Sequence, residues 1–160
     1  MKKIEIQATL DVFDTLDETT KEIQELMLKA VAIRDKAYAP YSDFLVGAAI
    51  LMDNGEIVTG NNQENASYPS GLCAERTAIY YAGANYPGVG IKTIALSAKS
   101  QRYQLITPVP PCGACRQSIA EYEQNQKKPI EIYFMGETGK VVKSNSLADL
   151  LPLSFDSSYL

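Results

Sequence analysis

Residues 61–78 read NNQENASYPSGLCAERTA and place a thiol and a carboxylate two positions apart, at Cys73 and Glu75. A second stretch, PPCGACRQ, carries the only other cysteines, Cys112 and Cys115. Each stretch lies between a strand-like pattern and a helix-like one, so both cysteine groups are predicted where a loop enters a helix. Backbone N–H groups and the helix dipole stabilise thiolates in that position. We therefore predict that two distant segments of the chain meet around three sulfur atoms.

The segments around these stretches alternate between strand-like and helix-like periodicity. This order predicts an α/β fold with three layers, in which a mixed β-sheet of about five core strands carries helices on its faces. Helices are predicted near 23–33, 72–82 and 113–123, and core strands at 44–52, 56–60, 91–98, 130–135 and 140–142.

An extra N-terminal strand is predicted at residues 3–12, where apolar and polar side chains alternate. The alternation indicates a half-buried strand, and we expect it at the edge of the sheet or at a subunit contact. Asp17 or Thr19 is then predicted to cap the first helix.

The length and composition indicate one soluble globular domain. The chain has 160 residues, of which 46% are hydrophobic and 21% are charged, as in ordinary globular proteins. We expect a single domain over residues 1–160, with an N-terminal extension at 1–22 and a core at 23–155.

Charge and hydropathy argue against two classes of partner. The formal net charge is -4, whereas nucleic-acid polymers are held by dense Lys and Arg contacts to phosphate. A small substrate with little or no charge fits better. The longest apolar stretch, residues 44–52, is too short to span a bilayer, and no N-terminal signal pattern is visible. We expect no membrane partner and a cytoplasmic location, where thiols stay reduced.

The chain contains no histidine, which excludes Ser/His/Asp and Cys/His nucleophile systems. Structural zinc sites normally have four protein ligands, whereas catalytic sites have three and an open position for water. Three cysteines with no histidine therefore predict one catalytic Zn²⁺ held by Cys73, Cys112 and Cys115. Water at the open position becomes a nucleophile at neutral pH, and Glu75 is placed to move its proton.

Other interpretations of these residues stay open. A lone cysteine is often a small buried hydrophobic residue, and a C-x-x-C pair can be a redox centre. An Asp or Glu could close a purely structural zinc site, and Glu75 alone could be a solvated residue at a helix start. The joint pattern favours catalytic zinc, because redox contexts lack the third cysteine and the Cys-x-Glu spacing.

Two side chains near the cysteines are predicted to donate hydrogen bonds to sulfur. Three thiolates around one Zn²⁺ leave a surplus negative charge, which weakens the pull of the ion on its water. Donors to the sulfur atoms counter this effect. Arg76 follows the Cys-Ala-Glu triplet and Gln117 follows the C-x-x-C pair, so we predict these two as the donors.

The motifs taken together resemble those of cytidine deaminases of the small, homotetrameric type, over about residues 26–155. The triplet CAE followed by PCGAC matches the signature of zinc-dependent deaminases, with cysteine in place of the first histidine. The further matches are YAPYS at 38–42, Phe44, VGAA at 46–49, Asn62, ENA at 64–66, CAERTA at 73–78 and PCGACRQ at 111–117.

This resemblance implies a hydrolase that deaminates cytidine and deoxycytidine to uridine and deoxyuridine, releases ammonia and serves pyrimidine salvage. It implies one zinc ion per subunit on Cys73, Cys112 and Cys115, with Glu75 as the proton shuttle. It also implies a homotetramer whose sites lie near subunit interfaces.

The resemblance further implies roles in substrate binding for four residues. Asn62 and Glu64 would hold the ribose hydroxyls, Phe44 would border the pyrimidine, and Ala74 would place its backbone near the base. An amide and a carboxylate suit neighbouring hydroxyls because they pair both donors and acceptors. Without the resemblance, Asn62 and Glu64 could be polar loop residues and Phe44 a core residue.

Three other residues are expected to act across subunits. By the same resemblance, Ala66 and Tyr68 would lie at a subunit boundary and reach a neighbour's site, and Phe155 would close a neighbour's pocket. The chain departs from the family pattern at residues 1–22, which are predicted to carry an added strand and turn.

Two alternative functions stay open. A related nucleoside-analogue deaminase, such as a blasticidin S deaminase, shares the zinc and glutamate chemistry, although Asn62 with Glu64 and the RTA run at 76–78 favour the ribonucleoside enzyme. A non-catalytic binding module stabilised by zinc would not need the open ligand position or Glu75.

Overall fold

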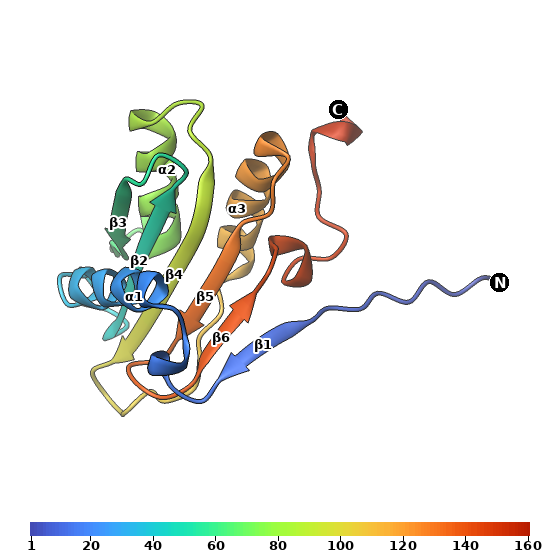
Figure 1. Cartoon of the computed structure of the whole chain (residues 1–160). Coiled ribbons are helices and arrows are strands. Elements are labelled where there is room, and N and C mark those ends of the chain that lie inside the picture. Colours follow the sequence, from blue (N-terminus) through green and yellow to red (C-terminus); the bar gives the residue numbers. More distant parts are fainter.

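A computed structural model describes residues 1–160 and shows a six-stranded mixed sheet with three α-helices (Figure 1). The strand order is β1-β6-β5-β4-β2-β3; β4 and β5 are parallel, and the other neighbours are antiparallel. The strands are β1 (Leu10–Phe13), β2 (Phe44–Met52), β3 (Ile57–Asn61), β4 (Ile91–Ser100), β5 (Glu131–Met135) and β6 (Val141–Ser144). The helices are α1 (Lys21–Arg34), α2 (Ala74–Asn85) and α3 (Gly113–Gln126). The predicted five core strands and extra N-terminal strand are confirmed.

The helices cover both faces of the sheet and give the predicted three layers. On one face, α1 buries Ile23 and Met27 in a cluster with Ala49 and Leu51 of β2. On the other face, α2 and α3 pack against a larger cluster that contains Ile50. Successive side chains of a strand point to opposite faces. A central strand that is covered on both faces is therefore apolar at nearly every position.

A glycine in β3 sets the distance between the sheet and α2. A β-carbon added at Gly60 would lie 2.6 Å from the backbone nitrogen of Ala78 and 2.9 Å from the carbonyl oxygen of Ala74. Only glycine permits this approach of strand to helix backbone. Because α2 begins directly after Cys73, the contact also fixes where that cysteine lies.

The N-terminal strand is shorter than residues 3–12 and is not half-buried, so that prediction is corrected. Only Leu10–Phe13 pair with β6, which itself has only four residues, Val141–Ser144. Residues before Leu10 extend past the end of β6 and find no partner strand. Val12 is 59% exposed. The expectation of an edge position is confirmed by the strand order.

The cap of α1 also differs from the sequence prediction. The Thr20 side chain accepts the N–H of Ile23 at 3.4 Å, whereas Asp17 belongs to a preceding 3₁₀ turn and Thr19 follows that turn. No helix of the chain is both long enough and apolar enough to cross a membrane.

Candidate metal centre and adjoining cavity

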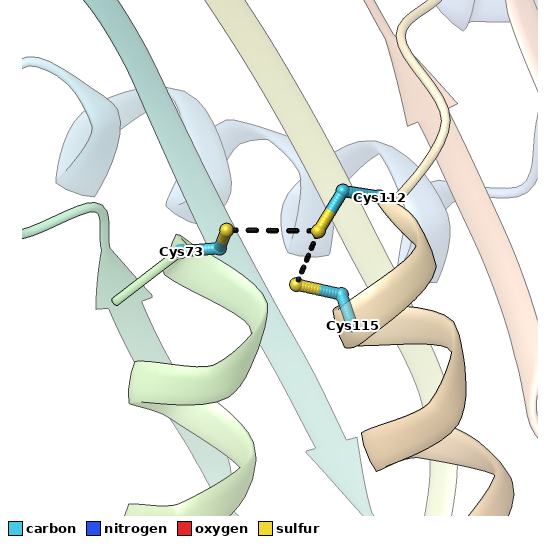
Figure 2. Close-up of side chains that lie close together, drawn as sticks. All are labelled: Cys73, Cys112 and Cys115. Atoms are coloured by element: carbon cyan, nitrogen blue, oxygen red, sulfur yellow. Dashed lines mark hydrogen bonds between the residues drawn. The ribbon is translucent and has the colours of Figure 1, made fainter. Parts of the chain in front are cut away.

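The three cysteines come from the starts of two neighbouring helices. Cys73 is the residue before α2, Cys112 is the residue before α3, and Cys115 lies in the first turn of α3. Figure 2 shows the three side chains pointing toward one another. The Sγ atoms of Cys73 and Cys112 lie 3.8 Å apart, and those of Cys112 and Cys115 lie 3.5 Å apart. The structure therefore brings together the three predicted sulfur atoms.

The donor set and spacing of this cluster fit a zinc ion. All three Sγ atoms lie within 4.8 Å of one another, and none forms a disulfide. Zn–S bonds of about 2.3 Å in tetrahedral geometry separate two sulfurs by roughly 3.8 Å. Three thiolates are soft ligands of the kind that zinc accepts, and three protein ligands are typical of a catalytic zinc site.

The charge around the cluster favours a thiolate at Cys73. The Nη2 atom of Arg76 lies 3.8 Å from the Sγ of Cys73, which is the partner that the sequence predicted. The hydrogen bond from Cys115 and the neighbouring Arg76 lower the pKa of Cys73 to about 5. The same bond to Cys73, together with burial, raises the pKa of Cys115.

Gln117 has a different partner from the predicted one. Its Nε2 donates to the carbonyl oxygen of Phe155 at 2.9 Å and not to a sulfur atom. The neighbouring Arg116 donates from Nε to the carbonyl oxygen of Pro111 at 2.8 Å and from Nη1 to that of Leu150 at 2.7 Å. These two residues of α3 therefore hold the C-terminal segment.

Glu75 is a buried carboxyl group beside the cysteine cluster. It lies in the first turn of α2 with 5% of its surface exposed, and it lines the same cavity as Cys73 and Cys112. Burial raises the pKa of Glu75 from 4.5 to about 7. A carboxyl group with a pKa near neutrality can both accept and donate a proton at neutral pH.

A cavity of about 380 Å³ adjoins the cluster. Six of the predicted site residues line it: Phe44, Asn62, Glu64, Cys73, Glu75 and Cys112. The sequence analysis missed seven others: Ser42, Val46, Leu96, Ser97, Ala98, Val109 and Pro110. Ser42, Val46 and Pro110 stand within the quoted motifs and could have been included. The residues from β4 could not be predicted as cavity residues from the local sequence, because strand pairing alone brings them to the cavity.

Asn62 and Glu64 are held in place by the start of β2 and the turn before it. The Asn62 Oδ1 accepts the N–H of Val46 at 2.8 Å, and its Nδ2 donates to the carbonyl oxygen of Phe44 at 2.9 Å. The Glu64 Oε2 accepts the N–H of Tyr41 at 2.9 Å. Both side chains retain hydrogen-bonding capacity for a ligand.

The Glu64 carboxylate also accepts the Ser42 hydroxyl, and this contact bears on its charge. Partial burial raises the pKa of Glu64, but the hydrogen bonds from Ser42 and from the backbone of Tyr41 and Ser42 outweigh it and lower the pKa below 4.5. Glu64 is therefore a fixed anion at the rim of the cavity.

The other predicted substrate residues lie outside this cavity. Ala74 is fully buried at the start of α2. Ala66 and Tyr68 are exposed, and the Tyr68 ring lies 6.0 Å from that of Tyr41 beside a second cavity of about 420 Å³. Phe155 is 58% exposed and stacks on Tyr159 at 5.6 Å.

The fold and the site together define a zinc-dependent hydrolytic enzyme. The sequence model of one family, described as "Cytidine and deoxycytidylate deaminase zinc-binding region", matches residues 20–128. The chain belongs to this deaminase family, and the matched region contains the three cysteines and Glu75.

Relatives of known name support this assignment. The chain is 40% identical to the cytidine deaminase of Halalkalibacterium halodurans over 132 residues, which cover 82% of this chain and 92% of the relative. It is 39% identical to that of Sporosarcina psychrophila over 140 residues, covering 87% and 95%. The crystal structure of cytidine deaminase from Burkholderia pseudomallei is similar, with 41% identity, a TM-score of 0.72 and coverage of 86% and 100%.

Proposed function

We propose that this chain deaminates cytidine and deoxycytidine by hydrolysis, giving uridine or deoxyuridine and ammonia, as a step of pyrimidine salvage. The observation that carries the proposal is the convergence of Cys73, Cys112 and Cys115 next to a cavity that the buried Glu75 also lines. The names of the similar proteins support the same reaction.

The reaction requires a nucleophile and a group that moves protons. A zinc ion held by Cys73, Cys112 and Cys115 would acidify water and so supply a nucleophile at neutral pH. Glu75 accepts the proton that the attacking water loses and delivers it to N3 of the pyrimidine, which offsets the charge that develops on the ring. The water oxygen adds to C4. Glu75 then takes the proton of the new C4 hydroxyl and passes it to the amino group, the C4–N bond breaks as the C4 carbonyl forms, and ammonia leaves.

The residues of the cavity suit a pyrimidine nucleoside. Asn62 and Glu64 hold the ribose hydroxyls and Phe44 borders the ring; Ala74, next to the cavity residues Cys73 and Glu75 in the chain, places its backbone near the base. The cavity of about 380 Å³ falls within the usual size of small-molecule sites. A ligand without the hydroxyls would leave unpaired the acceptor capacity that Glu64 keeps beside its bonds to Tyr41 and Ser42, which gives selectivity for nucleosides.

The proposal extends to assembly and location. We propose that the chain works as one domain with its core at residues 23–155, in a homotetramer with sites near subunit interfaces. The exposure of Ala66, Tyr68 and Phe155 supports roles toward a neighbouring subunit. Three free thiols support a reducing compartment, and we propose the cytoplasm.

One assay tests the proposed reaction. Purified protein loaded with zinc is mixed with cytidine, deoxycytidine or blasticidin S, and the loss of substrate absorbance and the release of ammonia are measured. Turnover of cytidine or deoxycytidine is expected. A zinc-loaded protein that leaves both unchanged, or that acts only on blasticidin S, would overturn the proposal.

A further inference from the structure

The N-terminal arm, residues 2–12, carries an exposed apolar face that the deaminase site does not explain. Ile4 is 89% exposed and Ile6 51%, and Leu10 and Val12 on the same side of the chain are also exposed. Figure 1 shows the arm running outward from β1, away from the rest of the sheet. The match to the family model begins only at residue 20, so the arm lies outside it. Apolar side chains at every second position are typical of a strand that is covered on one face.

The arm also continues an open sheet edge. β1 pairs with β6 on one side and is the last strand of the sheet on the other. The N–H of Thr9 donates to Oδ1 of Asp149, which follows β6, so the N–H of Thr9 points to the β6 side. Backbone groups alternate in direction along a strand. In an arm that continues β1 as an extended strand, those of Ile6, Ala8 and Leu10 face the open edge, where a further strand could pair.

The charges on the polar side of the arm fit a second copy of the same arm. Lys3 stands near one end and Asp11 near the other, at equal distances in sequence from Gln7. We propose that the arms of two copies pair as antiparallel strands about a twofold axis at Gln7, with Lys3 of each copy opposite Asp11 of the other. A contact of this kind is closed by its own symmetry and needs no other partner.

The same register aligns the apolar side. Ile4 lies opposite Leu10 of the other copy, and Ile6 lies opposite Ala8, so the exposed apolar side chains become cross-strand neighbours on one face of the pair. A register centred on Ile4 would pair Lys3 with Glu5, but it overlaps far fewer residues and leaves Asp11 without a partner from the second copy. The longer register is therefore favoured.

The proposed pairing continues a charge pattern that already crosses the sheet. Asp11 lies opposite Lys143 of β6, and Lys143 forms an ion pair with Glu131 of β5 at 2.7 Å. Lys3 of a second copy, placed on the open side of Asp11, would extend this alternation of negative and positive charge by one strand. Opposite charges directly across a strand pair stabilise it, and like charges destabilise it.

Cysteine cross-linking of the full chain tests the register. Opposite Cα atoms of antiparallel strands lie about 4.5–5.5 Å apart, which is within the reach of a disulfide. Gln7→Cys protein is therefore expected to form a covalent dimer on mild oxidation, as seen on non-reducing gels. Unsubstituted protein controls for the native cysteines.

Two matched variants on the same side of the arm distinguish the proposed register from non-specific cross-linking. In the proposed register, Glu5→Cys and Thr9→Cys each lie roughly 14 Å from their own counterparts, at about 3.4 Å per residue. Neither is expected to cross-link alone, whereas a mixture of the two should form the mixed dimer. Failure of Gln7→Cys to cross-link, or equal yields from all three single variants, would overturn the proposal.

Charge reversal provides an independent test in the Gln7→Cys protein. Asp11→Lys places two lysines opposite each other at both ends of the pair and should slow cross-linking roughly tenfold. Adding Lys3→Asp should restore the rate. That second change cannot repair contacts of Asp11 within its own chain, so recovery reports on the second copy. A double variant as slow as Asp11→Lys alone would overturn the proposed pairing.

Discussion

The Sγ atoms of Cys73 and Cys112 lie 3.8 Å apart, although they come from two different helix starts on opposite sides of β4 in the sequence. Neither helix alone holds more than two of the three thiols. The centre therefore exists only when α2 and α3 occupy their places on the same face of the sheet. A metal ion bound here would therefore join α2 to α3 and stabilise the fold, in addition to its part in the reaction.

Removal of the metal should abolish activity and lower stability. Dialysis against a chelator is expected to eliminate turnover of cytidine and to lower the thermal midpoint, because a ligand that binds only the folded state stabilises it. Zinc should restore both. Cys112→Ala should lose bound zinc, measured by elemental analysis, whereas the α3 variant Ser118→Ala should retain it. A chelated protein with full activity would contradict the zinc assignment.

Glu75→Gln should leave the metal in place and remove proton transfer. A positioned general acid–base contributes about 10²–10⁴-fold to a rate, so kcat should fall by that factor. Zinc content and the circular dichroism spectrum should stay unchanged. Glu121→Gln, an exposed position on α3, serves as the control and should keep full activity. Undiminished turnover of zinc-loaded Glu75→Gln would show that another group moves the proton.

Glu64→Gln should weaken recognition of the sugar. The neutral amide cannot accept as strongly from a hydroxyl, so kcat/KM for cytidine should fall by roughly 10-fold or more, through loss of a charge-assisted hydrogen bond. The control is Ser42→Ala, which removes a partner of Glu64 but keeps its charge. A smaller loss is expected from that control. Equal losses in the two variants would indicate that Glu64 acts only by holding the turn.

Gly60→Ala should destabilise the protein and displace α2. The added methyl group meets backbone atoms of the helix, which cannot move aside as a flexible side chain can. The free energy of unfolding should fall by about 1–3 kcal/mol, as for other overpacked sites. Urea unfolding measures this change. Thr59→Ala, exposed on the same strand, should change stability far less, and equal effects would argue against the close approach.

The metal ligands and the sheet core are the features that local sequence predicts best. A chain with three cysteines and no histidine has few ways to bind a transition metal, and the cysteine spacing selects helix starts. Strand β2 is apolar at nearly every position because it is covered on both faces, so its ends were predicted correctly at Phe44 and Met52.

Other features depend on contacts that no local pattern contains. The length of β1 is limited by the four residues of β6, not by the alternation of its own side chains. Ala98 and Val109 line the cavity because strand pairing and a loop bring them there. The partner of Gln117 is the backbone of Phe155, some 38 positions away in the chain, and spacing from Cys115 could not reveal it.

Arg116 connects α3, the helix that carries Cys115, to two other segments of the chain. Its guanidinium group donates one hydrogen bond to the loop before Cys112 and another to the C-terminal segment at Leu150. A rotation of α3 about its axis would therefore displace the loop before Cys112 and the C-terminal segment together. Gln117 on the same helix holds the backbone of Phe155, so the position of the aromatic end of the chain also depends on the helix that carries Cys115.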